Sequence, residues 1–347
     1  MATELNPRDL TTRSGSSCAP AQRCLAPVKI SFLVAALFVV LGLYQERLNF
    51  RLASSSHQVY NQRETHLRLL QGAPEVHLDA ARDYRGAFAT KTEKIIFCAI
   101  AKVGSSEWLK VLRWIDGQAD WEVPDHSGHG LRTLKDMGID EANQLLNDPT
   151  WFRFAVVREP AERLLSCFRE KCNQWNMKAG YQNCPYLELW PEIFRERLGD
   201  DVPRVPNEET NEIMSQVYRD EGRMQIFPQY VQAITRRVLE SPCTENPHWI
   251  PQWCQCSLDV TYPHFEVVRW RNMSAEVVEG ILSVASSPER GREMAAFVQK
   301  RMRTNHDDKG KKTGAGELVK TAYSEEMLEA VREAYAKDYE LFSAYWE

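Results

Sequence analysis

Two short polar segments of this chain carry residue types that bind phosphate, and each follows an apolar run. The first reads Ala101-Lys102-Val103-Gly104-Ser105-Ser106-Glu107 and comes after the run Lys94 to Ile100. Where a glycine and serines open a helix, the first backbone N–H groups and the helix dipole favour an anion. Lys102 adds a full positive charge. The segment indicates a phosphate-binding turn, although an ordinary strand-to-helix connection has a similar composition and the pattern GxxxxGK[ST] is absent.

The second segment runs from Arg158 to Ser166 and follows the run Trp151 to Val157. Pro160 suits the first turn of a helix, and Ser166 lies about two helical turns beyond Arg158. A guanidinium fork and a hydroxyl can hold one phosphate between them. The alternative is that Arg158 only pairs with Glu162. One ligand with two separated phosphates would account for both segments.

The elements around these segments indicate how they are positioned. Apolar residues recur at helical spacing after each one, from Trp108 to Ile115 and from Leu164 to Phe168. Continuous apolar runs that alternate with helices are typical of a doubly wound parallel sheet flanked by helices, in the α/β class. Ligands of such sheets bind beyond the carboxyl ends of the strands. Both turns are therefore expected at one edge of one sheet.

A final helix is predicted at the C-terminus. Ser324 can cap it, and an apolar stripe continues from Leu328 to Phe342. This stripe is expected to pack in the core.

Composition excludes several classes of protein. The chain has 347 residues, of which 43% are hydrophobic and 26% charged, as in ordinary globular proteins. Its net charge of −5 does not suit a protein that coats nucleic acid, so no nucleic-acid partner is expected. Only one stretch is continuously apolar, which excludes a multi-pass membrane protein.

That stretch defines the expected domain organisation. Residues 1–29 read as a cytosolic disordered tail, 30–44 as a transmembrane signal anchor, 45–92 as a lumenal stem and 93–347 as one catalytic domain. A spanning helix needs about 20 apolar residues, so the anchor is short. A cleaved signal peptide and a buried soluble helix remain alternatives for residues 30–44.

The nine cysteines favour an oxidising compartment. Seven of them follow the apolar stretch, so at least one is free or pairs between chains. Cys254-Gln255-Cys256 lacks the spacing of a zinc site, and no metal is predicted. Asn272-Met273-Ser274 is a glycosylation sequon.

Both segments resemble a known family. IIFCAIAKVGSSEWLKVL and FRFAVVREPAERLLSCFREKC are similar to the two signatures of the Golgi carbohydrate sulfotransferases, chondroitin and dermatan 4-O-sulfotransferases among them. These signatures bind 3′-phosphoadenosine 5′-phosphosulfate (PAPS). Ala101 replaces the usual proline, and Gly104-Ser105-Ser106 stands where Ala-Cys-Thr is usual. The segments Asn246 to Gln252 and Tyr335 to Phe342 also resemble parts of that family.

The resemblance implies a P-loop-like sulfotransferase fold and a role for each segment. Residues 101–107 would hold the 5′-phosphosulfate. Residues 158–166, Arg163 included, would hold the 3′-phosphate, with Arg158 and Ser166 as direct ligands. Lys102 would stabilise the charge on the bridging oxygen as sulfonate leaves. The acceptor would be a glycan or polysaccharide hydroxyl, and no metal is required.

The acceptor hydroxyl needs a base, and imidazole has a suitable pKa. The candidates are His126, His129 and His248. His126 ranks first, because its spacing resembles that of a histidine in related sulfotransferases. The alternatives are a surface-loop histidine at 126 or 129 and a packing role for His248.

The resemblance also implies a type II protein of the Golgi membrane with a lumenal catalytic domain. Two other functions remain open: a nucleotide-dependent kinase-like P-loop enzyme, and a non-catalytic membrane glycoprotein that kept the fold. The kinase would need a Walker lysine motif and metal-binding carboxylates, neither of which is found. Lys102, Arg158 and Ser166 together favour a working nucleotide site. The acceptor sugar and the oligomeric state are not predicted.

Overall fold

The computed structural model describes residues 75–78, 86–123, 130–171, 223–270, 273–307 and 315–346. The chain divides into two units, Met1–Gln58 and Val59–Glu347, and every described residue belongs to the second. The predicted tail, the apolar stretch 30–44 and most of the predicted stem lie outside the described residues. Among the helices that are described, none combines the length and apolarity that a membrane crossing requires.

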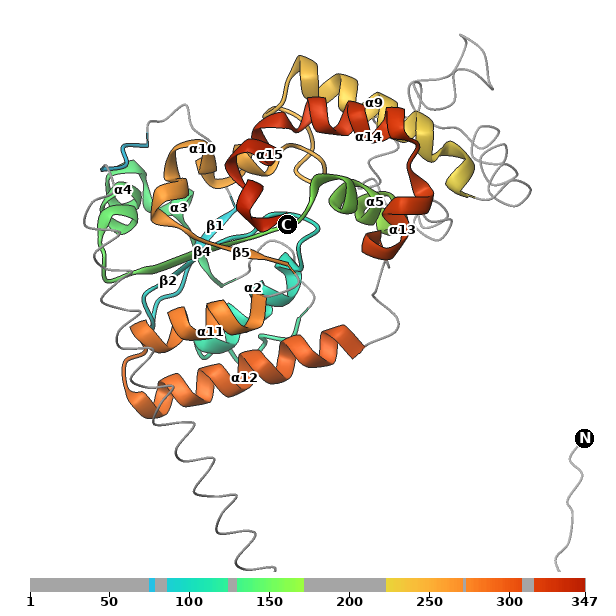
Figure 1. The fold of residues 1–347 in the computed structure, drawn as a ribbon. Coiled ribbons are helices and arrows are strands. Elements are labelled where there is room, and N and C mark those ends of the chain that lie inside the picture. Colours follow the sequence, from blue (N-terminus) through green and yellow to red (C-terminus); the bar gives the residue numbers. More distant parts are fainter. Residues whose placement is uncertain are drawn as a thin grey trace, which may run out of the picture. The chain divides into compact units, whose positions relative to one another are not determined.

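A five-stranded sheet in the order β3-β1-β2-β4-β5 organises the domain (Figure 1). Strands β2, β4 and β5 run parallel, whereas β1 pairs antiparallel with both β2 and β3. The strands are β1 (Ala87–Ala89), β2 (Ile95–Cys98), β3 (Arg132–Thr133), β4 (Phe152–Val157) and β5 (Glu266–Arg269).

The sheet is therefore mixed, which corrects the expectation of a wholly parallel one. The two predicted strands are present as β2 and β4, and they are parallel neighbours as expected. The five residues between β1 and β2 are too few for a crossover, so this pair is an antiparallel hairpin.

Helices cover both faces of the sheet, with α2, α11 and α12 on one side and α10 and α15 on the other (Figure 1). The α-helices are α2 (Ser105–Ile115), α3 (Leu134–Met137), α4 (Ile139–Asn147), α5 (Pro160–Lys171), α9 (Phe227–Glu240), α10 (Leu258–Thr261), α11 (Met273–Val284), α12 (Pro288–Asp307), α13 (Ala315–Ala322), α14 (Glu325–Ala334) and α15 (Ala336–Leu341). The 3₁₀ turns are η1 (Arg223–Ile226), η2 (Gln252–Ser257), η3 (Tyr262–His264) and η4 (Ser343–Tyr345).

Aromatic side chains fill the face beneath α2 and α11. The rings of Phe97 and Phe154 stack at 4.8 Å between centroids, and Trp108 of α2 meets Phe154 edge-on at 5.0 Å. A β-carbon on Gly280 of α11 would lie 2.0 Å from the ring of Phe152, so this helix approaches β4 closely. The packing fixes α2, and with it the turn that precedes α2.

A disulfide ties the opposite face to the sheet. Cys98, the last residue of β2, is bonded to Cys256 of η2, and a second disulfide joins Cys243 and Cys254. Cys167 of α5 is buried and is the free cysteine among the described residues.

A second core lies among α5, α9, α13 and α14. Phe168 of α5 packs against Phe227 and Tyr230 of α9, with ring centroids 4.9 and 5.0 Å away. The hydroxyl of Tyr323, which follows α13, donates to the carbonyl of Ala161 at 2.9 Å. Because α5 belongs to this core while β4 belongs to the sheet, the turn between them joins the two cores.

The compact domain begins before residue 93. β1 is part of the sheet, and Val76 and Leu78 are buried against it. Asn147 and Asn143 of α4 each bond both the N–H and the C=O of one residue in this segment, Val76 and Leu78 respectively, at 2.7–3.1 Å. Part of the predicted stem is therefore packed on the domain.

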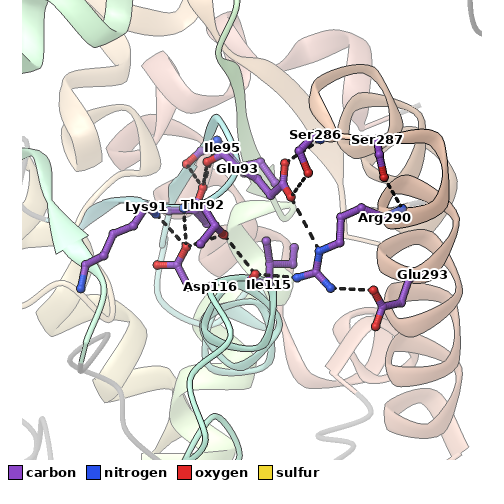
Figure 2. A network of polar contacts seen from close by, with 11 residues as sticks. Lys91, Thr92, Glu93, Ile95, Ile115, Asp116, Ser286, Ser287, Arg290 and Glu293 are labelled. Atoms are coloured by element: carbon purple, nitrogen blue, oxygen red, sulfur yellow. Dashed lines mark hydrogen bonds and ion pairs between the residues drawn. The ribbon is translucent and has the colours of Figure 1, made fainter.

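A polar network closes the edge of the sheet where β2 begins (Figure 2). The buried carboxylate of Glu93 accepts from the backbone N–H and the hydroxyl of Ser286 at 2.9 and 3.0 Å, and Arg290 lies 3.7 Å away. Arg290 also donates to the carbonyl of Ile115 at 2.7 Å. These contacts tie the C-terminal end of α2 to α12, at the end of the parallel strands opposite to the two turns.

The predicted C-terminal helix is capped by Ser324 as expected, but it breaks at Tyr335 into α14 and α15. At the break, the Tyr335 hydroxyl bonds the carbonyl of Trp249, and Asp338 accepts from the N–H groups of Gln252 and Trp253. The Tyr335 bond reaches the segment before η2 and the Asp338 bonds reach the first two residues of η2, so the break coincides with tertiary contacts that the helical pattern does not encode.

Candidate functional site

The two predicted turns lie against each other. Arg158, at the end of β4, donates from Nη1 to the carbonyl oxygen of Lys102 in the β2–α2 turn at 3.3 Å. The carboxyl ends of neighbouring parallel strands thus bring the two turns together, as the sequence predicts. Arg158 is 8% exposed, and its Nε contacts Glu162 at 3.4 Å, the pairing that the alternative interpretation expected.

The first turn has an unusual backbone. Lys102 and Gly104 adopt positive φ angles of 72° and 80°, in the left-handed region, and Gly104 is the residue before α2. A β-carbon on Gly104 would lie 2.1 Å from the ring of Trp270, the residue that follows β5. The guanidinium of Arg158 lies 5.8 Å from the centroid of the same ring. Trp270 therefore contacts both turns.

The ammonium of Lys102 forms an ion pair with Glu170 of α5. Only 7% of the Lys102 side chain is exposed, against 49% for Glu170. Burial on its own would raise the pKa of Glu170, but the charge and hydrogen bond of Lys102, together with Lys171 and His248, lower this pKa below its usual range. Glu170 is ionised at neutral pH and balances the charge of Lys102.

Arg163 has a different environment from Arg158. Its guanidinium is fully buried and donates to three backbone carbonyls, those of Ala101 at 2.9 Å, Ile250 at 2.7 Å and Pro247 at 3.0 Å. These bonds join the first turn to the segment around His248. The contacts favour a positioning role for Arg163, which the resemblance placed in the phosphate-holding segment without naming it as a direct ligand.

A network of buried hydrogen bonds holds the backbone of Arg158 in place. Gln252 accepts from the backbone N–H of Arg158 at 3.0 Å and donates to its carbonyl at 2.9 Å. The backbone N–H of Gln252 donates in turn to Asp338 of α15 at 2.9 Å. Burial raises the pKa of Asp338, and the bonds from Gln252 and Trp253 partly offset this effect. The final helix thus positions the second turn.

His248 lies beside the first turn. Its backbone N–H and its Nδ1 both lie within hydrogen-bonding distance of Asn246 Oδ1, at 3.0 and 2.7 Å. Burial, followed by the nearby charges of Lys171 and Lys102, lowers the pKa of His248 from 6.5 to about 3. The imidazole is therefore neutral at physiological pH.

The other predicted site residues are distributed as follows. Ser105 and Ser106 open α2, and Val103 and Ser166 are buried. Glu107 pairs with Lys110 at 2.9 Å and with Arg301 of α12 at 3.0 Å, so its carboxylate is engaged away from Lys102. His126, His129 and the sequon residue Asn272 lie outside the described residues.

Sequence reasoning missed three contributors, Trp270, Glu170 and Asp338. Trp270 follows a short strand and has no motif around it. Glu170 lies in the segment that resembles the second signature, but after Ser166, the last residue to which the resemblance assigned a role. Trp270 would have been found by considering every residue that follows an apolar run, whether that residue is polar or apolar.

This arrangement is suited to binding an anion. The backbone of Lys102, the guanidinium of Arg158 and the amino end of the 11-residue helix α2 lie where two strands end. Within the described part of the chain, no cluster of His, Cys, Asp or Glu side chains could hold a metal ion.

The chain matches the sulfotransferase family over residues 85–345, and it belongs to this family. It is similar to carbohydrate sulfotransferase 10 of Gallus gallus, with 37% identity over 124 residues that make up 34% of this chain and 31% of that protein. The corresponding protein of Rattus norvegicus is 28% identical over 171 residues, 47% of this chain and 42% of that protein. Carbohydrate sulfotransferase 11 of the same species is 29% identical over 99 residues, 26% of this chain and 28% of that protein. The matches span less than half of these relatives' length, and no solved structure matches.

Proposed function

We propose that this protein transfers a sulfonate group from PAPS to a hydroxyl of a carbohydrate. The observation that carries the proposal is the contact between Arg158 Nη1 and the Lys102 carbonyl at 3.3 Å. It joins two segments that both resemble PAPS-binding signatures, within a chain of the sulfotransferase family.

The residues at the strand ends fit this donor. PAPS carries a phosphosulfate at one end and a 3′-phosphate at the other, so it needs two anion sites a short distance apart. The first turn offers Lys102 and the amino end of α2, and the second offers Arg158 with Ser166 further along α5. Arginine suits a phosphate because its fork can donate two parallel hydrogen bonds.

In the proposed reaction, Lys102 is the residue that accelerates sulfonate transfer. As the sulfur–oxygen bond to the 5′-phosphate breaks, negative charge grows on the bridging oxygen, and a cation placed there stabilises the transition state more than the ground state. The pair with Glu170 holds Lys102 in place before the donor binds. The donor's own negative charge then competes with Glu170 for the ammonium.

A carbohydrate acceptor and a secretory location are further parts of the proposal. The relatives named above are carbohydrate sulfotransferases. The two disulfides fit an oxidising compartment. We place the catalytic domain in the Golgi lumen, anchored to the membrane through the apolar stretch 30–44.

The test is incubation of the full chain in detergent with ³⁵S-labelled PAPS and a panel of glycans that includes desulfated polysaccharides. We expect label on at least one carbohydrate and release of adenosine 3′,5′-bisphosphate in equal amount. Binding of this bisphosphate without any transfer would support the non-catalytic alternative. Absence of both binding and transfer would refute the proposal.

A further inference from the structure

We propose that Asn246 and Arg163 are positioning residues that make His248 the proton acceptor for the sugar hydroxyl. Asn246 selects the tautomer of the imidazole, and Arg163 holds the imidazole beside Lys102. This inference rests on the proposed function and adds a base to it.

The hydrogen bonds of Asn246 determine the tautomer. Its Oδ1 lies 3.0 Å from the backbone nitrogen of His248, which can only donate, so the side-chain atom at this position is the amide oxygen. The same oxygen lies 2.7 Å from Nδ1 of the imidazole. Because that oxygen can only accept, Nδ1 carries the proton in the neutral ring. Nε2 then has the lone pair that a general base needs.

The placement follows from Arg163. Its guanidinium bonds the carbonyls of Pro247 and Ile250 on both sides of His248, and the carbonyl of Ala101 next to Lys102. A single planar group thus fixes the distance between the backbone of the histidine and that of the lysine. Since Arg163 is fully buried, this link is shielded from solvent.

The charges around His248 indicate when it becomes basic. Lys171, Glu170 and Arg163 face it from α5, and Lys102 faces it from the first turn. Burial and the three cations outweigh Glu170 and keep the imidazole neutral, but they also make it a weak base. An anionic donor beside Lys102 would offset the cations, so the basicity of His248 should rise when the donor binds.

The step balances as follows. The sugar oxygen forms a bond to sulfur, and the bond between sulfur and the bridging oxygen of PAPS breaks. The electron pair of that bond stays on the bridging oxygen, which gives adenosine 3′,5′-bisphosphate. The hydroxyl proton moves to His248 Nε2 and later to water.

Four variants of the full chain test the inference. His248→Gln should lower kcat by about 10²–10⁴, and Asn246→Ala by about 10-fold or more through loss of the tautomer. Asn246→Asp keeps the acceptor oxygen and adds a negative charge. It should therefore retain most of kcat while the acidic limb of the pH profile moves to higher pH. His77→Gln is the control, because His77 is exposed and pairs only with Glu75 among the described residues.

Two further readouts separate this role from a structural one. Affinity for adenosine 3′,5′-bisphosphate, measured by calorimetry, should stay within about twofold in all four variants. A proton NMR titration, assigned by the resonance missing in His248→Gln, should show a pKa far below 6.5 for His248 and a higher one with the bisphosphate bound.

Normal kcat in His248→Gln would overturn the inference and leave the proposed function intact, with His126 as the next base to test. An acidic limb that does not move in Asn246→Asp would also overturn it. Absence of sulfate transfer by the unmodified chain would refute the proposed function, and the inference with it.

Discussion

At the scale of the residue, the ammonium of Lys102 and the guanidinium of Arg158 are the cations at the two strand ends. Lys102 is held by Glu170 and Arg158 by Glu162, so each cation has a carboxylate partner before any ligand arrives. Such pairing keeps two buried cations from destabilising the fold. It also means that a bound anion must compete with an internal partner.

Replacing Lys102 with alanine should lower kcat by about 10²–10³, because the charge on the bridging oxygen loses its stabilising cation. Steady-state kinetics with labelled PAPS measures this effect. The matched control is Lys94→Ala, which removes an equally charged side chain that is 52% exposed at the opposite edge of the sheet. Equal rates for the two variants would remove Lys102 from the mechanism.

Replacing Arg158 with glutamine should weaken binding of adenosine 3′,5′-bisphosphate by roughly 10- to 100-fold, the usual cost of a charge-assisted hydrogen bond. Calorimetry provides the affinity, and thermal unfolding shows whether the variant is folded. Unchanged affinity in a folded variant would contradict the assignment of Arg158 to the 3′-phosphate.

At the scale of the element, the first turn depends on a glycine with a tryptophan behind it. Gly104→Ala places a methyl group 2.1 Å from the ring of Trp270 and forces a positive φ on alanine. Gly117→Ala also forces a positive φ, 72°, on alanine, but its β-carbon would have no atom within 4 Å. Gly117→Ala should lose about 1 kcal/mol of stability and Gly104→Ala about 1–3 kcal/mol more, but only Gly104→Ala should also weaken bisphosphate binding. Equal affinities would show that the clash does not reshape the turn.

The network at the far edge of the sheet in Figure 2 should affect stability but not the site. Glu93→Gln disrupts a buried carboxylate, 4% exposed, and should cost about 1–3 kcal/mol of unfolding free energy. Glu293→Gln removes the charge of the other carboxylate that pairs with Arg290. Because the Glu293 side chain is 57% exposed, this change should cost well under 1 kcal/mol. Urea unfolding measures both. A loss of bisphosphate affinity in folded Glu93→Gln would show that the two edges are coupled.

Sequence reasoning was successful where the signal is local. The apolar runs before Lys102 and Arg158 predict strands, and every residue of β2 and β4 is indeed buried. Pro160 predicts the start of α5. It named Arg158 and not Arg163 as a direct ligand, but the sequence could not show how differently the two guanidinium groups are engaged. The difference arises from Pro247 and Ile250, more than 80 residues away along the chain. The antiparallel β1 escaped notice because three residues are too short a pattern.

At the scale of the whole molecule, the two disulfides among the described residues close loops of very different length. Cys98 and Cys256 are 158 residues apart, whereas Cys243 and Cys254 are 11 apart. Alanine at both positions of the first pair should cost about 2 kcal/mol more unfolding free energy than at both positions of the second, from loop entropy alone. Urea unfolding without reductant tests this difference. Equal losses, or a larger loss from the short loop, would contradict the expectation.

The position of the long-range disulfide has a consequence for when the protein becomes active. Cys98 ends β2 only four residues before Lys102, so the sulfur bond secures the strand that carries the first turn. A newly made chain with reduced thiols would have its sheet and its signatures but a loosely held donor site. Under the proposed function, sulfate transfer would then depend on oxidation of the Cys98–Cys256 pair.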